Sequence, residues 1–192
     1  EFNKKQVIAY MPTWRKNAAF HGPAARATHL VEHLKKWDSM LSHDQVVYVK
    51  QHDINSVRID FSRYKNIRPF PEKYSTYEFL NATDALVTDY SSVMFDFALT
   101  GRKIVLFAYD EDWYQKIRGL HVDLKELPFP IVKTVEDLVE KLRYPKRYND
   151  ADFKKKFCSA NTKNVAKALC HRLLLDESSK LIEEREMKTP NW

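Results

Sequence analysis

Residues 84–101 read DALVTDYSSVMFDFALTG, and this stretch decides the fold because it changes from a strand pattern to a helix pattern within a few residues. Residues 85–87 form a short apolar run that is typical of a buried strand. The apolar residues of 93–99 are too continuous for a strand with one wet face, so we expect a helix there. A polar corner, named here the 88–92 corner, joins the two elements and consists of Thr88, Asp89, Tyr90, Ser91 and Ser92.

The 88–92 corner is a candidate anion site. A serine at the start of a helix satisfies free backbone N–H groups with its hydroxyl, and the same groups, with the helix dipole, attract anions such as phosphate. The alternative interpretation is that Ser91 or Ser92 is only a helix cap and Asp89 only a turn residue, because caps far outnumber ligand sites. The rest of the chain has to decide between them.

Strand and helix patterns alternate along the whole chain. Strands are expected at 7–11, 45–49, 66–70, 85–87, 103–108 and 131–132, and helices at 30–41, from 75, at 93–99 and at 134–143, with a loop at 17–28. This alternation predicts an α/β fold with a Rossmann-like, mainly parallel sheet and helices on both faces. From Asp152 onward the chain is expected to be helical, with a buried stripe formed by Val165, Ala168, Leu169, Leu173 and Leu174.

The chain begins at Glu1 without methionine and enters a strand almost at once, which indicates that upstream coding sequence has been cut away. We expect residues 1–5 to be a cloning scar or a linker, 6–176 to be one domain and 177–192 to be a loosely held tail.

The carboxyl ends of parallel strands meet at one edge of a sheet, which we name the carboxyl edge. Polar residues follow the predicted strands at that edge, so we expect them to converge on one site, and this convergence favours a ligand over simple caps. They are the segments Thr13 to Lys16, Lys50 to His52, Thr88 to Ser92, Tyr109–Asp110 and Arg118–Gly119.

Composition restricts the partners. Of the 192 residues, 44% are hydrophobic, which is typical of a folded domain. The formal net charge of +6 suits an anionic partner, which could be nucleic acid, a nucleotide, a polyanionic polymer or an anionic membrane surface. The two cysteines, Cys158 and Cys170, have neither zinc-site spacing nor a disulfide framework, which favours a reduced, cytosolic setting. The sequence contains no apolar run long enough to span a membrane and no secretory signal.

The candidate chemistry is phosphate binding without a glycine-rich loop. Only three glycines occur, and none belongs to a GxGxxG or GxxxxGK pattern. Lys50, Arg118 or Arg15 would supply the cations, and His52 would donate to phosphate or act as a base. The alternatives are a solvated loop position for His52 and a surface ion pair with residues 110–112 for Arg118. No metal cluster and no cofactor motif is visible.

Several of these motifs together resemble the teichoic-acid glycerophosphotransferase family, the CDP-glycerol poly(glycerophosphate) polymerases and their CDP-ribitol relatives. The resemblance runs in order from about residue 6 to 125, and departs from the family pattern where Asp53 replaces the proline that usually follows the histidine. The motifs that carry it are 10–15 (YMPTWR), 50–52 (KQH), 88–96 (TDYSSVMFD), Tyr109–Asp110 and Arg118–Gly119.

The resemblance implies the second, nucleotide-binding half of a GT-B architecture, with the acceptor half missing. It implies that the bacterial enzyme works at the inner face of the cell membrane, without a cofactor, and moves glycerol phosphate or ribitol phosphate from a CDP-polyol to a polymer hydroxyl, releasing CMP. His52 and Arg118 would be catalytic. The residues expected to bind substrate are Arg15, Lys50, Thr88, Asp89, Ser91, Ser92, Tyr109, Asp110 and Gly119.

Two other functions stay open. One is half of a nucleotide-sugar glycosyltransferase, which has the same fold and would prefer UDP-sugars to CDP-polyols. The other is a module without catalytic activity that binds a polyanion through its basic surface. Nucleic acid is the less favoured polyanion, because core packing rather than stacking on bases explains most of the aromatic residues.

Overall fold

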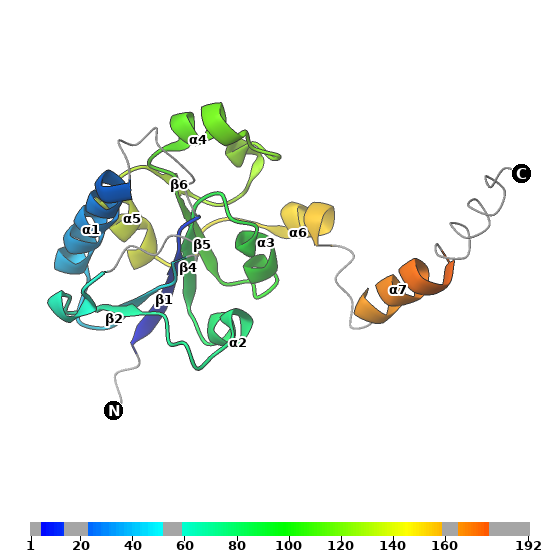
Figure 1. Ribbon diagram of the computed structural model, residues 1–192, viewed down its shortest axis with the longest axis horizontal. Coiled ribbons are helices and arrows are strands. Elements are labelled where there is room, and N and C mark those ends of the chain that lie inside the picture. The colour runs from blue at the N-terminus through cyan, green and yellow to red at the C-terminus, as the bar shows by residue number, and fades with distance from the viewer. Residues whose placement is uncertain (1–4, 14–22, 52–58, 159–164, 177–192) are drawn as a thin grey trace, which may run out of the picture.

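The computed structural model describes residues 5–13, 23–51, 59–158 and 165–176 (Figure 1). The predicted residues Arg15 and His52, the linker at 1–4 and the tail at 177–192 lie outside them.

A six-stranded, fully parallel sheet forms the centre of the fold. Its strands are β1 (Gln6–Met11), β2 (Gln45–Val49), β3 (Ile67–Pro69), β4 (Ala85–Thr88), β5 (Lys103–Phe107) and β6 (Ile131–Val132). Their order in the sheet is β3-β2-β1-β4-β5-β6, and every neighbouring pair is parallel. This is the strand order of a doubly wound, Rossmann-like sheet, so the predicted fold class is confirmed.

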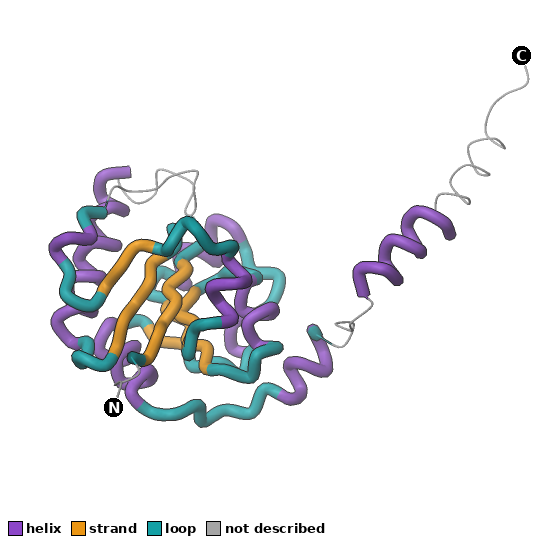
Figure 2. Tube along the Cα trace, turned by 90° about the horizontal axis from the view of Figure 1, so that it is seen from below, coloured by secondary structure: helices purple, strands orange, loops and turns teal. Residues whose placement is uncertain are grey.

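Helices cover both faces of the sheet (Figures 1 and 2). On one face, α1 (Pro23–Met40) and α5 (Val135–Arg143) bury Leu34, Trp37 and Leu138 against the strands. On the other face, α2 (Thr76–Asn81), α3 (Val93–Ala98) and α6 (Ala151–Phe157) contribute Phe79, Phe97 and Phe153. Successive residues of β4 and β5 belong alternately to the two clusters, which is why these strands read as unbroken apolar runs.

Two helical segments differ from the sequence prediction. Helix α1 begins at Pro23, inside the predicted loop 17–28, because proline suits the first helical position and residues 24–27 are three alanines and an arginine, which favour helix. Helix α4 (Glu111–Arg118) was not predicted, although it has acidic residues in its first turn and basic residues in its last. Arg118 is the last residue of this helix.

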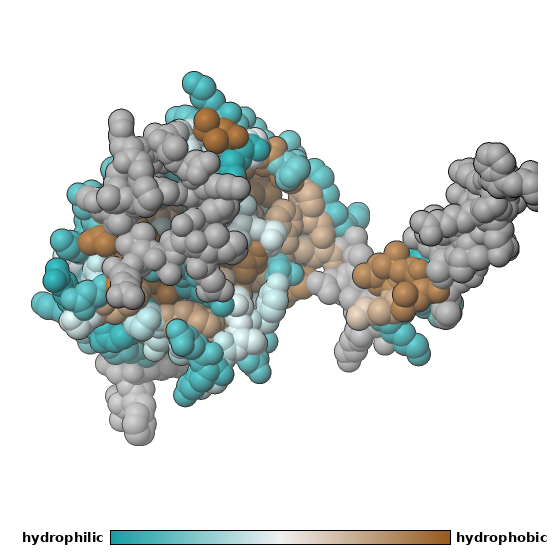
Figure 3. Space-filling view, in the orientation of Figure 1, coloured by the Kyte–Doolittle hydropathy of each residue, from teal (hydrophilic) through white to brown (hydrophobic). Residues whose placement is uncertain are grey.

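The predicted leucine stripe after residue 152 is wrong for the side chains that are described. Leu169, on α7 (Val165–His171), and Leu173 and Leu174, on the π-helical turn Arg172–Asp176, are 55%, 48% and 69% exposed. Figure 3 shows the hydrophobic surface that they form. Helical spacing of apolar residues indicates an apolar face but does not say whether the domain covers it.

Candidate functional site

The candidate site lies where the strand order reverses. β1 and β4 are neighbours, with Met11 opposite Thr88 at their carboxyl ends, and the chain leaves them toward opposite sides of the sheet. In open α/β sheets such a switch point leaves a crevice outside the carboxyl ends of the strands, and ligands bind there. The 88–92 corner, which connects β4 to α3, lies at this switch point.

Asp89 ties the two strands together across the switch point. Its carboxylate is 2% exposed and accepts hydrogen bonds from the backbone N–H of Thr13 at 2.9 and 3.1 Å, from the Thr13 hydroxyl and from the N–H of Tyr90 at 2.6 Å. The buried hydroxyl of Thr88 donates to the carbonyl of Met11 at 2.7 Å. These contacts join the carboxyl ends of β1 and β4, which would form the floor of a crevice at the switch point.

The two serines of the corner differ in their contacts. The Ser91 Oγ accepts a long hydrogen bond, 3.4 Å, from the N–H of Val93. Ser92 directly precedes α3, is exposed, and its hydroxyl makes no capping hydrogen bond. A simple helix cap therefore does not account for Ser92.

Tyr90 joins the corner to the end of β5. Its hydroxyl donates to Asp110 Oδ1 at 3.0 Å, and its ring stacks on Tyr114 of α4, with centroids 3.9 Å apart and planes at 21°. Asp110 is 8% exposed and precedes α4. Tyr90 was expected only as part of the corner. Its pairing with Tyr114 had no local signal, because Tyr114 lies on a helix that was itself not predicted.

Tyr109 packs beside the same strand end. Its ring lies 4.6 Å from that of His33 and 5.2 Å from that of Phe107. Burial, followed by the nearby charge of His29, lowers the pKa of His33. Among the residues that the structure describes, none forms a hydrogen bond with the buried Nδ1 of His33. A neutral imidazole suits this aromatic cluster, which supports Tyr109 from the α1 side.

Lys50 follows β2 and faces the first turn of α2. Its backbone N–H donates to Tyr10 O at 2.9 Å, and its ammonium donates to the hydroxyl of Thr76 at 2.7 Å. The ammonium also lies 4.2 Å from the centre of the Phe70 ring. The side chain is thus held at the carboxyl edge.

Arg118 and Gly119 end α4. Arg118 is exposed, and Gly119 closes the helix by donating its N–H to Gln115 O at 3.0 Å. The backbone of Gly119, at φ 70° and ψ 165°, is in a region that is almost restricted to glycine. Gly119 therefore has a structural reason to be glycine, independent of any ligand.

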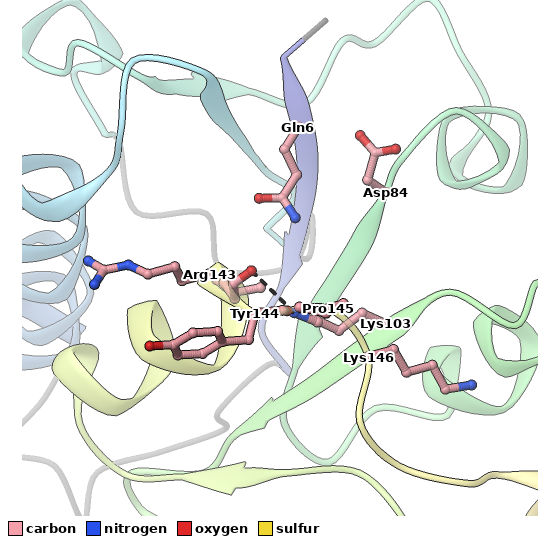
Figure 4. A pocket seen from close by; sticks show the side chains of 8 residues that line it. Gln6, Asp84, Lys103, Arg143, Tyr144, Pro145 and Lys146 are labelled. Carbon is pink, nitrogen blue, oxygen red and sulfur yellow. Dashed lines mark hydrogen bonds between the residues drawn. The ribbon is translucent and has the colours of Figure 1, made fainter.

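A cavity of about 340 Å³ lies at the opposite edge of the sheet, beside the amino ends of β1 and β5 (Figure 4). Its buried cation, Lys103, donates to the carbonyls of Lys141, Leu142 and Tyr144, and so caps the carboxyl end of α5. The side chains of Arg143 and Lys146 extend away from each other in Figure 4. The cavity has the contacts of a helix terminus and lacks the converging groups of a ligand site.

Within the described residues there is no group of three or more histidine, cysteine, aspartate or glutamate side chains that could hold a metal ion. Likewise, none of the helices in this part of the chain has the length and apolar character needed to cross a bilayer.

The strand order, with helices on both faces of a parallel sheet (Figure 1), defines a Rossmann-like α/β domain. Residues 2–175 match the family model described as CDP-Glycerol:Poly(glycerophosphate) glycerophosphotransferase. The chain belongs to this family, as its motifs predicted.

Relatives and a solved structure agree with this assignment. The chain is 30% identical over 177 residues to the teichoic acid poly(glycerol phosphate) polymerase of Bacillus spizizenii and 34% identical over 183 residues to the teichoic acid glycerol-phosphate transferase of Staphylococcus aureus. Each alignment covers 88% of this chain and 45% of the relative, so the chain spans less than half the length of these relatives. A variant of the wall teichoic acid polymerase TagF soaked with CDPG superposes with a TM-score of 0.70 at 28% identity, over 93% of this chain and 45% of TagF. The predicted GT-B-like half is confirmed by this match.

Proposed function

We propose that this chain is the donor-binding domain of a transferase that moves glycerol phosphate, or ribitol phosphate, from a CDP-polyol to the hydroxyl end of a teichoic acid or capsule polymer. The observation that carries the proposal is the family match over residues 2–175 on a sheet whose crevice lies at the β1–β4 switch point. The net charge of +6 suits both an anionic donor and an anionic polymer.

The donor diphosphate would lie over the 88–92 corner. Ser92 offers a hydroxyl that α3 does not use, Ser91 lies beside it, and Lys50 supplies a positive charge from β2. Thr88, Asp89 and Asp110 would shape the crevice through their bonds to Met11, Thr13 and Tyr90. Arg118 is exposed at the end of α4 and would contact phosphate. His52 and Arg15, which lie outside the described residues, are proposed for the same role from the sequence.

In the transfer, the acceptor hydroxyl oxygen attacks the phosphorus that bears the polyol. A new phosphorus–oxygen bond forms, the bond to the bridging oxygen breaks, and CMP leaves with that electron pair while the hydroxyl proton passes to a base. Cations around the diphosphate stabilise the charge that develops on the leaving phosphate. The site would work at the cytoplasmic face of the membrane, where the full-length enzyme meets its polymer.

Isothermal calorimetry tests the donor assignment. The chain is titrated with CDP-glycerol, CDP-ribitol, UDP-glucose and cytidine. We expect saturable binding of a CDP-polyol and at least tenfold weaker binding of UDP-glucose and of cytidine, which lacks the diphosphate. Preference for UDP-glucose would point to a nucleotide-sugar glycosyltransferase. The proposal is refuted if the chain binds neither CDP-glycerol nor CDP-ribitol.

A third result separates the polyanion-binding alternative. Binding to poly(glycerol phosphate) that falls steeply with salt and is unchanged by Ser91→Ala with Ser92→Ala would favour a module that recognises only charge. A donor site built on the corner predicts instead that this double variant weakens CDP-polyol binding.

A further inference from the structure

The first turn of α2 holds the ammonium of Lys50 through neutral groups. The described residues include no carboxylate in ion-pair contact with Lys50; its ammonium is held by the Thr76 hydroxyl at 2.7 Å and by the face of the Phe70 ring at 4.2 Å. A neutral hydroxyl and a π face fix the position of the group and do not themselves neutralise its charge.

Thr76 is itself firmly placed. It is the first residue of α2, directly after Ser75, whose hydroxyl accepts from the Glu78 N–H at 3.3 Å while the Glu78 carboxylate accepts from the Ser75 N–H at 2.8 Å. This capping box fixes the backbone of the turn. Tyr77, the next residue, donates to Asp96 of α3 at 3.2 Å and ties the turn to the helix that follows the 88–92 corner.

The ring under the ammonium is fixed as well. Phe70 packs against Phe79 with centroids 5.0 Å apart and planes at 69°, and Phe79 packs in the same way against Tyr48 of β2. The Lys50 side chain is half-buried between these groups. A lysine in solution samples many rotamers, whereas here two anchored groups select one position before any ligand arrives.

We propose that Thr76 is a positioning residue for donor binding: its hydroxyl, with the Phe70 ring, holds the Lys50 ammonium at the carboxyl edge so that its remaining N–H groups can meet a phosphate of the donor. This inference rests on the proposed function, because the phosphate is that of the CDP-polyol. An ammonium has three N–H donors, and Thr76 occupies one of them.

A double-mutant cycle tests the role. CDP-glycerol binding is measured by calorimetry for the wild-type chain, Thr76→Val, Lys50→Met and the double variant, with Thr76→Ser as the conservative replacement. Thr100→Val, which makes the same change at the end of α3, is the control. We expect Thr76→Val to weaken CDP-glycerol binding about tenfold, and Thr76→Ser and Thr100→Val to stay within about twofold of wild type.

The decisive result is in the Lys50→Met background. In that background Thr76→Val should not weaken CDP-glycerol binding further, because the Thr76 hydroxyl acts only through the Lys50 ammonium. Thr76→Val should also leave the weak binding of cytidine unchanged, because cytidine has no phosphate for the ammonium to meet. Melting temperatures of all variants establish that they fold. The positioning role is refuted, and the proposed function stands, if the wild-type chain binds CDP-glycerol and either of two results is found. In the first, Thr76→Val binds CDP-glycerol as tightly as wild type. In the second, Thr76→Val weakens binding in the Lys50→Met background by the same factor as in the wild-type chain. If the wild-type chain binds CDP-ribitol and not CDP-glycerol, the same cycle is measured with CDP-ribitol; if it binds neither, both are overturned.

Discussion

Removing the carboxylate of Asp89 should loosen the join between β1 and β4. In Asp89→Ala the backbone N–H groups of Thr13 and Tyr90 lose their acceptor in a largely buried place. A buried donor without a partner costs about 1–3 kcal/mol, so two of them predict a loss of about 3 kcal/mol of unfolding free energy. For a domain of this size that lowers the melting temperature by roughly 6–12 °C.

Differential scanning calorimetry measures the melting temperature, and urea unfolding measures the unfolding free energy. Asp60→Ala is the matched control. Asp60 also accepts from a backbone N–H and a hydroxyl, both of Ser62, but it is exposed, so its removal should hardly change the melting temperature. Asp89→Asn keeps one acceptor oxygen and should fall between Asp89→Ala and wild type. If Asp89→Ala melts within 2 °C of wild type, Asp89 is not a structural tie and the description of the crevice floor is wrong.

Three further predictions concern separate parts of the chain. Burial raises the pKa of Tyr148 to about 12 in the folded chain, whereas a tyrosine in the unfolded chain ionises near 10. The contribution of Tyr148 to stability should therefore be intact below about pH 10 and be lost as the pH rises toward about 12. The midpoint of urea unfolding should fall over this range in the wild-type chain and fall less in Tyr148→Phe. Gly119→Ala should lower the unfolding free energy by about 2 kcal/mol, and with it the melting temperature, because an alanine is strained at the backbone angles of Gly119. The neighbouring Arg118→Ala should leave the melting temperature unchanged. Equal melting temperatures of the two variants would contradict the backbone explanation. In the full-length enzyme, His52→Ala and Arg118→Ala should each reduce kcat/KM for the CDP-polyol at least tenfold with an unchanged melting temperature; unchanged kinetics in both would overturn their assignment.

The sequence predicted the elements whose signals are local. β4 and β5 are buried on both faces, so their apolar runs are unbroken. The helix expected from residue 75 is α2, and a capping box between Ser75 and Glu78 opens it. Gly101, past the end of α3, has a positive φ of 70°, which suits glycine after a helix. The parallel α/β class followed from the alternation of these elements.

Features that depend on distant residues could not be read in this way. The order of the strands is set by which edges pair, and the bonds from Asp89 to Thr13 and from Lys50 to Thr76 join residues that are 76 and 26 positions apart. The exposure of Leu169, Leu173 and Leu174 likewise depends on what packs against them, which helical periodicity does not encode. The roles of His52 and Arg15, which lie outside the described residues, stay predictions from the sequence.

The measurement that tests the central claim most directly is calorimetric titration of this chain with CDP-glycerol, compared with the Ser91→Ala plus Ser92→Ala variant. A donor site over the 88–92 corner predicts saturable one-to-one binding by the wild-type chain and at least tenfold weaker binding by the folded double variant. A wild-type chain that binds no CDP-polyol, or a double variant that binds as tightly as wild type, would contradict it.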